Sequence, residues 1–377
     1  MHNIIVLGAG MVGSAMALDL AKKHQVTVAD INEKNLSELQ HKNKKIRVAI
    51  LNVTNKIAVQ KMLLPFDLVI CAVPGFLGFE TLKSIIDAGK NVVDISFFPE
   101  NSLELNQLAV EKNVTAIVDC GVAPGMGNYI LGYYNELLKI TDFECLVGGL
   151  PFEKKWPFNY KAPFSPIDVI EEYTRPARYV ENGTMVVKEA LSDNEHIHFT
   201  KIGTLEAFNS DGLRSLIYTM PHIPNMKEKT LRYPGHSNYI KVLKESGFFD
   251  EEKIKINGVE VSPLEFTSKI LFKEWQLQKT ENEFTVMRIT LKGTDKNNTP
   301  KTVVYNLFDT FCKTTKISSM ARTTGYTATA TANMLLEGLF DEKGIFPPEL
   351  VGKHENCFNY ILNYLEERNV IYVKEFH

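Results

Sequence analysis

The first ~120 residues alternate short apolar runs with segments of helical length. The runs are rich in β-branched residues and apolar throughout, which is typical of strands buried on both faces of a parallel sheet. We expect six such strands, over residues 3–7, 26–30, 46–51, 67–73, 91–96 and 114–119, with helices such as 11–23 and 76–89 between them. The pattern predicts a doubly wound α/β domain over residues 1–127, whose ligands lie at the carboxyl ends of the strands.

The pattern changes beyond residue 128. Residues 150–166 are rich in proline and aromatic side chains, and alternating runs follow at 177–190, 196–203 and 284–295. The stretches ENGT (181–184) and KGTDKNN (292–298) read as hairpin turns. We therefore expect a second, α+β domain with an antiparallel sheet over residues 128–315. Residues 316–377 again show a helical pattern. The small side chains of Thr327, Ala328, Ala330 and Ala332 would let a helix pack closely against another element.

Composition narrows the class of protein. The chain is 44% hydrophobic and 23% charged, with a formal net charge of −3, so we expect neither a nucleic-acid nor a membrane partner. Five scattered cysteines without a C-x-x-C pair suit a reducing cytoplasm, and no cleavable leader is expected before the first strand. His196 and His198 share one side of a predicted strand but have no third ligand nearby, so no metal site is predicted.

A glycine-rich turn follows the first predicted strand. Gly8, Gly10 and Gly13 form a G-x-G-x-x-G motif that opens a helix, and Asp30 ends the next strand 22 residues after Gly8. These glycines permit a tight turn, close approach of a pyrophosphate and close helix–strand packing, and an acid at Asp30 accepts the ribose hydroxyls of NAD. Lys34 weakens the exclusion of NADP. The alternative is a purely structural role, in which the glycine turn packs a helix on a strand and Asp30 caps a loop.

Other predicted strand ends add polar groups to the same edge of the sheet. Pro74 and Gly75 follow one strand, and Asp94, Ser96 and Phe97 follow another. Asp94 is either a ligand-facing group or a buried capping acid. The stretch VDCGVAPGMGN (118–128) holds three glycines at the domain crossover, which is either a hinge or the wall of a ligand site.

Eight motifs in order resemble the saccharopine dehydrogenase-like family, and within it the L-lysine 6-dehydrogenases. They are GAGMVG, VVDISF, DCGVAPGMGN, NYKAPFSP, EYTRPARYVENG, EAFNSDGLRSL, KTLRYPGH and KGIFPPE, and they extend the resemblance from residue 3 to about 350. The family implies a Rossmann domain, an inserted α+β domain for substrate binding and dimerisation, and a C-terminal segment that returns to the nucleotide domain. A homodimer is therefore expected.

The same resemblance implies residue roles. Residues 10–13 would hold the pyrophosphate, Asp30 to Asn32 the ribose, and Asn52 with Val53 the adenine, while Ser96 and Phe97 would border both ligands. Arg232 would bind the substrate carboxylate. The full implied cofactor set is Gly8, Gly10, Met11, Val12, Gly13, Asp30, Ile31, Asn32, Asn52, Val53, Ala72, Ser96, Gly121, Val122 and Ser165. Saccharopine-forming members tend to carry an acid in place of Ala123, and its absence fits a smaller substrate.

The implied reaction is NAD-dependent oxidative deamination of an amino acid, with L-lysine giving 2-aminoadipate 6-semialdehyde, which cyclises to piperideine-6-carboxylate, together with ammonia and NADH. The lysine ε-ammonium, with a pKa of about 10.4, must first lose a proton. Asp211 and His236 are candidate proton acceptors, although Asp211 also suits a helix N-cap and a lone histidine is often structural. Tyr160, Lys161, Arg175 and Arg178 are further candidates without an assigned role. Two alternatives are a saccharopine reductase-type enzyme and a non-catalytic NAD-binding sensor.

Overall fold

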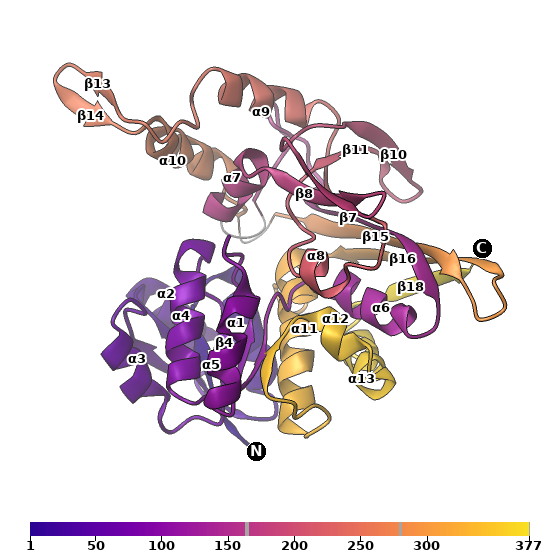
Figure 1. Cartoon of the computed structure of the whole chain (residues 1–377). Helices are drawn as coiled ribbons and strands as arrows, with labels where there is room; N and C mark the ends of the chain where they lie inside the picture. Colours follow the sequence, from indigo (N-terminus) through magenta and orange to yellow (C-terminus); the bar gives the residue numbers. More distant parts are fainter. Residues whose placement is uncertain (163–165, 279–280, 377) are drawn as a thin grey trace.

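The computed structural model describes residues 1–162, 166–278 and 281–376 and is built around two large β-sheets (Figure 1). The first sheet has seven parallel strands in the order β17-β6-β5-β4-β1-β2-β3. They are β1 (Asn3–Leu7), β2 (Gln25–Asp30), β3 (Arg47–Ile50), β4 (Leu68–Cys71), β5 (Val92–Asp94), β6 (Thr115–Ile117) and β17 (Gly344–Phe346). The predicted doubly wound domain is confirmed.

Helices cover both faces of this sheet, because its strands are apolar on both sides. Ile4 and Val6 of β1 belong to one hydrophobic cluster, and Ile5 and Leu7 belong to another on the opposite face. The crossover helices are α1 (Met11–Leu20), α2 (Glu33–Lys42), α3 (Lys56–Leu63), α4 (Gly75–Asp87) and α5 (Asn106–Glu111), with a short 3-10 helix over Ser102–Leu105.

The second sheet has nine strands. Seven follow the order β10-β11-β12-β7-β15-β16-β18, and β8 and β9 branch from β12. The strands are β7 (Lys139–Pro151), β8 (Ala177–Glu181), β9 (Thr184–Lys188), β10 (Glu195–Phe199), β11 (Gly203–Asn209), β12 (Asn225–Arg232), β15 (Glu283–Thr294), β16 (Pro300–Thr310) and β18 (Tyr372–Phe376). Both predicted hairpin turns are present, between β8 and β9 and between β15 and β16.

The predicted antiparallel pairing holds for the second sheet except between β7 and β12, which pair in parallel. A tight turn forces its two strands to be antiparallel, but β7 and β12 are separated by α7 (Pro166–Thr174), four strands and the short helix α8 (Leu216–Thr219). Beyond β12 the chain adds α9 (His236–Glu245), the small hairpin of β13 (Ile254–Ile256) and β14 (Val259–Val261), and α10 (Pro263–Trp275). These elements lie on the upper side of Figure 1, and the hairpin projects from the body.

On the other side of the second sheet lie α6 (Met126–Asn135), α8 (Leu216–Thr219), α11 (Ser319–Leu336), α12 (Pro348–Gly352) and α13 (Glu355–Glu366) (Figure 1). Of these, α6 packs on β7, and α11 packs on β15 and β16 and on α1 of the first domain. One hydrophobic cluster contains Val6 of the first sheet, Met334 of α11 and Met287 and Ile289 of the second sheet. A single core therefore joins the two sheets.

The C-terminal segment contributes a strand to each of the two sheets. The small residues of α11 let it lie against α1, where a side chain at Gly325 would stand 3.1 Å from Met16. Strand β17 extends the first sheet beside β6, and β18 extends the second sheet beside β16. Residues 316–377 thus bind the two domains together rather than covering one of them.

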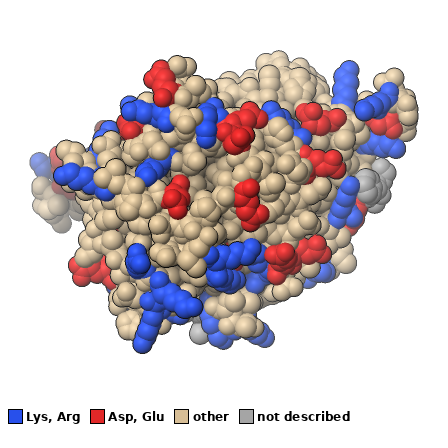
Figure 2. Space-filling view, turned by 90° about the horizontal axis from the view of Figure 1, so that it is seen from below, with Lys and Arg blue, Asp and Glu red and all other residues tan. Residues whose placement is uncertain are grey.

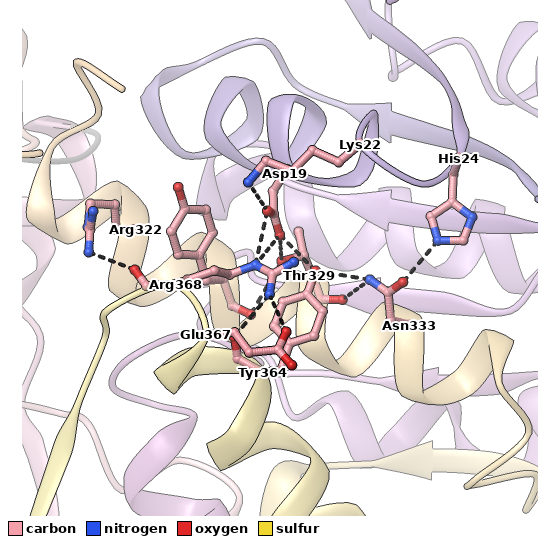
Figure 3. A network of polar contacts seen from close by, with 10 residues as sticks. Asp19, Lys22, His24, Arg322, Thr329, Asn333, Tyr364, Glu367 and Arg368 are labelled. Atoms are coloured by element: carbon pink, nitrogen blue, oxygen red, sulfur yellow. Dashed lines mark hydrogen bonds and ion pairs between the residues drawn. The ribbon is translucent and has the colours of Figure 1, made fainter. Parts of the chain in front are cut away.

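A buried polar network holds this segment in place (Figure 3). The carboxylate of Asp19 on α1 accepts hydrogen bonds from Arg368 at 2.9 Å, Tyr364 at 2.7 Å, Thr329 at 2.8 Å and Lys22 at 2.9 Å. Burial acts to raise the pKa of Asp19, but Arg368 and Lys22 outweigh it and hold the pKa below its ordinary value. Asp19 therefore carries a charge whose compensation comes mainly from the C-terminal segment.

Charges of both signs are interspersed on the face shown in Figure 2, with no large region of a single sign. Among the described residues, no helix is long and apolar enough to cross a membrane.

Removing Arg368 should uncover the buried charge of Asp19. We expect Arg368→Met to lower the free energy of unfolding by about 3–5 kcal/mol at pH 7, measured by urea denaturation. The loss should shrink as the pH falls through the depressed pKa of folded Asp19, because protonation removes the charge in either protein.

Lys22→Met is the matched control, since Lys22 meets the same carboxylate but its side chain is 60% exposed. Its effect should stay below about 1 kcal/mol. Equal losses in the two variants would contradict the role given to Arg368.

Candidate active site

A cleft of about 1790 Å³ lies between the carboxyl ends of the first sheet and the second domain. Its lining comes from the β1–α1 turn and the ends of β2, β4, β5 and β6 on one side, and from β7, α7, β12 and α10 on the other. Pockets for one small molecule usually measure about 300–1,000 Å³. The cleft is therefore large enough for a dinucleotide together with a small substrate.

The three glycines of the β1–α1 turn have different reasons to be glycine. A Cβ at Gly8, where φ is +112°, would lie 2.4 Å from the Ala72 carbonyl oxygen, and one at Gly13 would lie 2.1 Å from that of Gly8. A Cβ at Gly10 would meet no protein atom within 4 Å, and Gly10 lines the cleft. The open space above Gly10, at the N-terminus of α1, fits a bound pyrophosphate.

Asp30 braces the same turn. One carboxylate oxygen accepts the backbone N–H of Ala9 at 2.5 Å and the other accepts that of Asn32 at 2.7 Å. A carboxylate has about four acceptor sites, so Asp30 can cap the loop and still accept ribose hydroxyls. Lys34 and Lys42 also line this end of the cleft.

Most of the predicted cofactor residues lie together. The described members that line the cleft are Gly8, Gly10, Met11, Val12, Gly13, Asp30, Ile31, Asn32, Asn52, Val53, Ala72, Ser96, Gly121 and Val122. Ser165 lies outside the described residues. The predicted substrate residues Ser96, Phe97 and Arg232 line the cleft too, as does Asp211. Asp94 is fully buried beneath it and accepts the Ser96 N–H at 2.7 Å, as a capping acid would.

The glycine-rich crossover forms one wall of the cleft. Residues 121–124 line it, and the loop folds back on itself, with Gly121 N–H donating to the Pro124 carbonyl at 3.0 Å. Gly125 has φ +144°, and a Cβ there would stand 1.8 Å from the Gly121 oxygen. The Asn128 amide oxygen accepts the Gly125 N–H at 3.2 Å. The glycines therefore allow a compact turn that brings main chain to the cleft.

Four arginine–carboxylate pairs surround the substrate side of the cleft, by which we mean Asp119 and the lining residues of β7, α7, β12 and the loop before α8. Asp119 pairs with Arg214 at 2.7 Å, Asp211 with Arg178 at 2.8 Å, Glu172 with Arg232 at 2.7 Å, and Glu171 with Arg175. Sequence reasoning missed Asp119, Glu171, Glu172 and Arg214, although VDCG, EEYTRP and DGLRS carry them.

Phe97 sits between two of these arginines, with the Arg175 and Arg214 guanidinium carbons each 4.8 Å from its ring centre. The Nη1 atom of Arg175 is buried and has no hydrogen-bond partner among the described residues. By contrast, the Arg232 guanidinium already donates to Glu172, Tyr173, Tyr160 and its neighbour's carbonyl. Both N–H groups of Arg175 Nη1 are therefore free of partners in the described chain, whereas four of the five guanidinium N–H groups of Arg232 are used.

The two predicted proton acceptors are differently placed. Asp211 lines the cleft, but both of its oxygens accept from Arg178, at 2.8 and 2.9 Å. His236 does not line the cleft, and its ring nitrogens contact the Tyr173 hydroxyl at 3.0 Å and the Phe158 carbonyl at 2.9 Å. Burial and the nearby Arg232 charge lower the pKa of His236 to about 3. The structure thus gives His236 a packing role and no access to a substrate.

A fifth acid of the substrate side, Glu228, has no arginine. It lies on β12, lines the cleft and is only 6% exposed, and its carboxylate has no hydrogen bond or ion pair within the described ranges. Burial, with the nearby charges of Glu172 and Asp211, raises its pKa to about 8. Sequence reasoning missed it, although strand alternation places Glu228 on the same face as Arg232. The described residues contain no group of three His, Cys, Asp or Glu suited to a metal ion.

Two family models cover nearly the whole chain. The saccharopine dehydrogenase NADP binding domain matches residues 4–117, and the saccharopine dehydrogenase C-terminal domain matches residues 121–371. The chain belongs to the saccharopine dehydrogenase family. The predicted resemblance is therefore confirmed at the level of this family, and a pyridine-nucleotide site is supported.

Individual members of the family are distant in sequence. The mitochondrial alpha-aminoadipic semialdehyde synthase of Rattus norvegicus is 24% identical over 92% of this chain, which spans only 45% of that protein. The carboxyaminopropylagmatine dehydrogenase of Synechocystis is 21% identical over 93% of this chain and 92% of its own length. The apo saccharopine dehydrogenase (L-Glu forming) of Saccharomyces cerevisiae matches the full length of both chains, with a TM-score of 0.80 and 20% identity, which shows the shared fold.

The glycine geometry separates nucleotide binding from folding. We expect Gly10→Ala to leave the melting temperature unchanged, because its methyl group meets no protein atom, but to weaken dinucleotide binding at least about tenfold. Gly13→Ala should lower the melting temperature, because its methyl group would collide with the Gly8 backbone.

Calorimetric titration and thermal unfolding of both variants measure the two effects. Loss of fold in Gly10→Ala, or unchanged dinucleotide affinity, would contradict this division of roles.

Proposed function

We propose that this protein is an NAD-dependent dehydrogenase that oxidises the ε-amine carbon of L-lysine. The products would be 2-aminoadipate 6-semialdehyde, which closes to piperideine-6-carboxylate, ammonia and NADH. The observation that carries the choice of substrate is the charge balance of the cleft. Four acids of the substrate side are paired with four arginines, and the fifth, Glu228, has no arginine partner among the described residues.

A single excess acid suits a substrate with net positive charge. Lysine carries two ammonium groups and one carboxylate at neutral pH, whereas saccharopine carries three carboxylates and two protonated amines. Burying saccharopine beside an unpaired acid would leave carboxylates without cations, which is costly in a site shielded from water. Lysine instead brings the cation that Glu228 lacks.

A saccharopine reductase-type reaction is the second candidate. The family to which the chain belongs supports it, as does the fold shared with the yeast L-glutamate-forming enzyme. Ala123 supports the smaller substrate, because saccharopine-forming members tend to carry an acid at that position.

For the cofactor we propose NAD, held by the glycine turn of residues 8–13 and by Asp30. The Asp30 carboxylate would repel a 2′-phosphate, which supports NAD, while Lys34 and the match of residues 4–117 to the NADP binding domain of the family favour NADP. When bound, the nicotinamide supplies a hydride acceptor, and the chain's own residues orient the amine and move its proton.

For the substrate carboxylate we propose Arg175. Its Nη1 donor is buried without a partner in the described part of the chain, and the residue lines the cleft beside Phe97. Arg232 was the expectation from sequence, but its guanidinium is occupied by Glu172 and two tyrosines. A guanidinium with free donors binds a carboxylate far better than one already paired.

We also propose a cytoplasmic homodimer. All five cysteines are unpaired, which suits a reducing compartment. The projecting β13–β14 hairpin exposes about half of Ile254 and Ile256 and 63% of Val259, an apolar surface that a second copy of the chain would cover. Sedimentation of the purified protein as a monomer at micromolar concentration would contradict the dimer.

The reaction itself is tested by mixing the protein with NAD and L-lysine, without glutamate. We expect NADH absorbance to rise and free ammonia to appear in equal amounts, with NADP giving a lower kcat/KM than NAD. Turnover only with glutamate and the semialdehyde, in the reductive direction, would establish the saccharopine-type reaction instead. Nucleotide binding without turnover in either direction would favour a non-catalytic sensor.

The carboxylate contact is tested by comparing lysine with cadaverine, its decarboxylated analogue. Arg175→Lys keeps the charge but loses the planar fork, so kcat/KM for lysine should fall roughly 30-fold or more, corresponding to about 2–5 kcal/mol. Cadaverine, which we expect to be a poor substrate of the unmodified enzyme, should lose little more.

Arg232→Lys is the comparator, since Arg232 lies in the same cleft but uses four of its five guanidinium N–H groups within the protein. If kcat/KM for lysine, but not for cadaverine, falls in Arg232→Lys and not in Arg175→Lys, then Arg232 and not Arg175 binds the substrate carboxylate.

A further inference from the structure

We propose that Glu228 is the residue that takes the proton which the substrate ammonium must lose before its carbon is oxidised. This inference rests on the proposed amine oxidation, but it holds for lysine and for a secondary amine such as saccharopine alike. Both nitrogens arrive protonated, and neither can release a hydride from its carbon until a lone pair is free.

The fold aims Glu228 at the cleft. Glu228, Thr230 and Arg232 alternate along β12, and all three line the cleft, so they stand on one face of the strand. On one side the Glu228 carboxyl group packs against Gly212, where a Cβ would approach its Oε1 atom to 1.8 Å. Gly212 thus leaves the space that the carboxyl group occupies.

The other acids of the substrate side are committed. Each of Asp119, Glu171, Glu172 and Asp211 is bound by an arginine, which occupies its carboxylate oxygens. Burial raises the pKa of Asp119, Glu171 and Glu172, and their arginines act against that rise. His236 lies outside the cleft. Within the described ranges, Glu228 is the one acid of the substrate side whose oxygens are left for a substrate.

The surroundings of Glu228 raise the pKa of its carboxyl group towards that of the amine from which it would take a proton. Burial is the largest effect and raises its pKa to about 8, well above that of an exposed glutamate and nearer to that of an amine. The ionisable groups that act on it or feel its charge are Glu172 of α7, Asp211 and Arg214 of the loop before α8, Asp119 after β6, Cys145 of β7 and Tyr179 of β8. An entering ammonium group favours ionisation of Glu228 and then passes its proton to it.

The proton and electron balance closes. The N–H bond of the ammonium breaks and an O–H bond forms on Glu228, which frees the nitrogen lone pair. The C–H bond then gives its hydride to the nicotinamide of NAD, leaving an iminium that water converts to aldehyde and ammonia. For a primary amine, one ammonium, one NAD and one water give one aldehyde, one NADH, one ammonium ion and one proton, which Glu228 returns to solvent.

The first test is independent of turnover. Lysine is titrated into the protein loaded with NADH, which accepts no hydride, in two buffers of different ionisation enthalpy at pH 7. Because free Glu228 is mostly protonated at this pH, binding of an ammonium group should release close to one proton. In Glu228→Gln, which keeps the shape of the side chain, the release should fall to near zero.

The second test is the pH profile of amine oxidation. In the unmodified enzyme kcat/KM should rise with pH through about 8, as Glu228 ionises. Glu228→Gln should lose at least about 100-fold at neutral pH, and should recover only towards pH ~10, where the amine is deprotonated in solution. Gly212→Ala should show the same pattern more weakly, because its methyl group displaces the Glu228 carboxyl group.

Glu144→Gln is the matched control. Glu144 lies on the neighbouring strand β7, pairs with Lys227 and does not line the cleft, so its removal should change neither proton release nor the pH profile. Retained activity and proton release in Glu228→Gln, with the unmodified protein active, would overturn the role of Glu228 alone. No binding or turnover of lysine or saccharopine by the unmodified protein would overturn the proposed function, and this inference with it.

Discussion

The ion pair between Arg214 and Asp119 fixes the second domain to the first at the cleft. Both side chains are buried, and Arg214 also donates to the Phe98 carbonyl at 2.5 Å. The backbone of Arg214 is itself in the left-handed region, with φ +46°, a conformation that costs energy and persists because these contacts hold it. Loss of either partner would leave a buried charge, and loss of Arg214 would also remove one of the two guanidinium groups that contact the Phe97 ring.

Pairing explains how so many charges are tolerated within one cleft. A buried carboxylate costs several kcal/mol unless a cation compensates it, and four of the five acids have one. The fifth avoids this cost by staying neutral until a cation enters. In the proposed mechanism, substrate binding and proton transfer therefore both depend on Glu228 having no arginine partner. A neutral ligand of similar shape would gain little binding energy from this part of the cleft.

The sequence predicted most of the first domain and much less of the substrate side. Uniform apolar runs and a local glycine motif identify six parallel strands and the nucleotide turn, because their signals lie within a few residues. Strand β17 has three residues and escapes such reasoning. The pair of Asp119 and Arg214 spans 95 residues, and the isolation of Glu228 depends on where four arginines fold. No periodicity in the sequence records which carboxylates obtain a partner, so the predicted proton acceptors, Asp211 and His236, were chosen by residue type alone.

The C-terminal segment has a consequence for how the protein is made. Helix α11 covers α1, β17 completes the edge of the first sheet beside β6, and Arg368 neutralises Asp19. All three come from residues beyond 318, which leave the ribosome after both sheets have been largely synthesised. The nucleotide-binding domain is translated before this segment. The apolar surface of α1, the edge of the first sheet at β6 and the carboxylate of Asp19 therefore stay uncovered for most of synthesis. Folding of the domain must wait for the last part of the chain or be shielded until then.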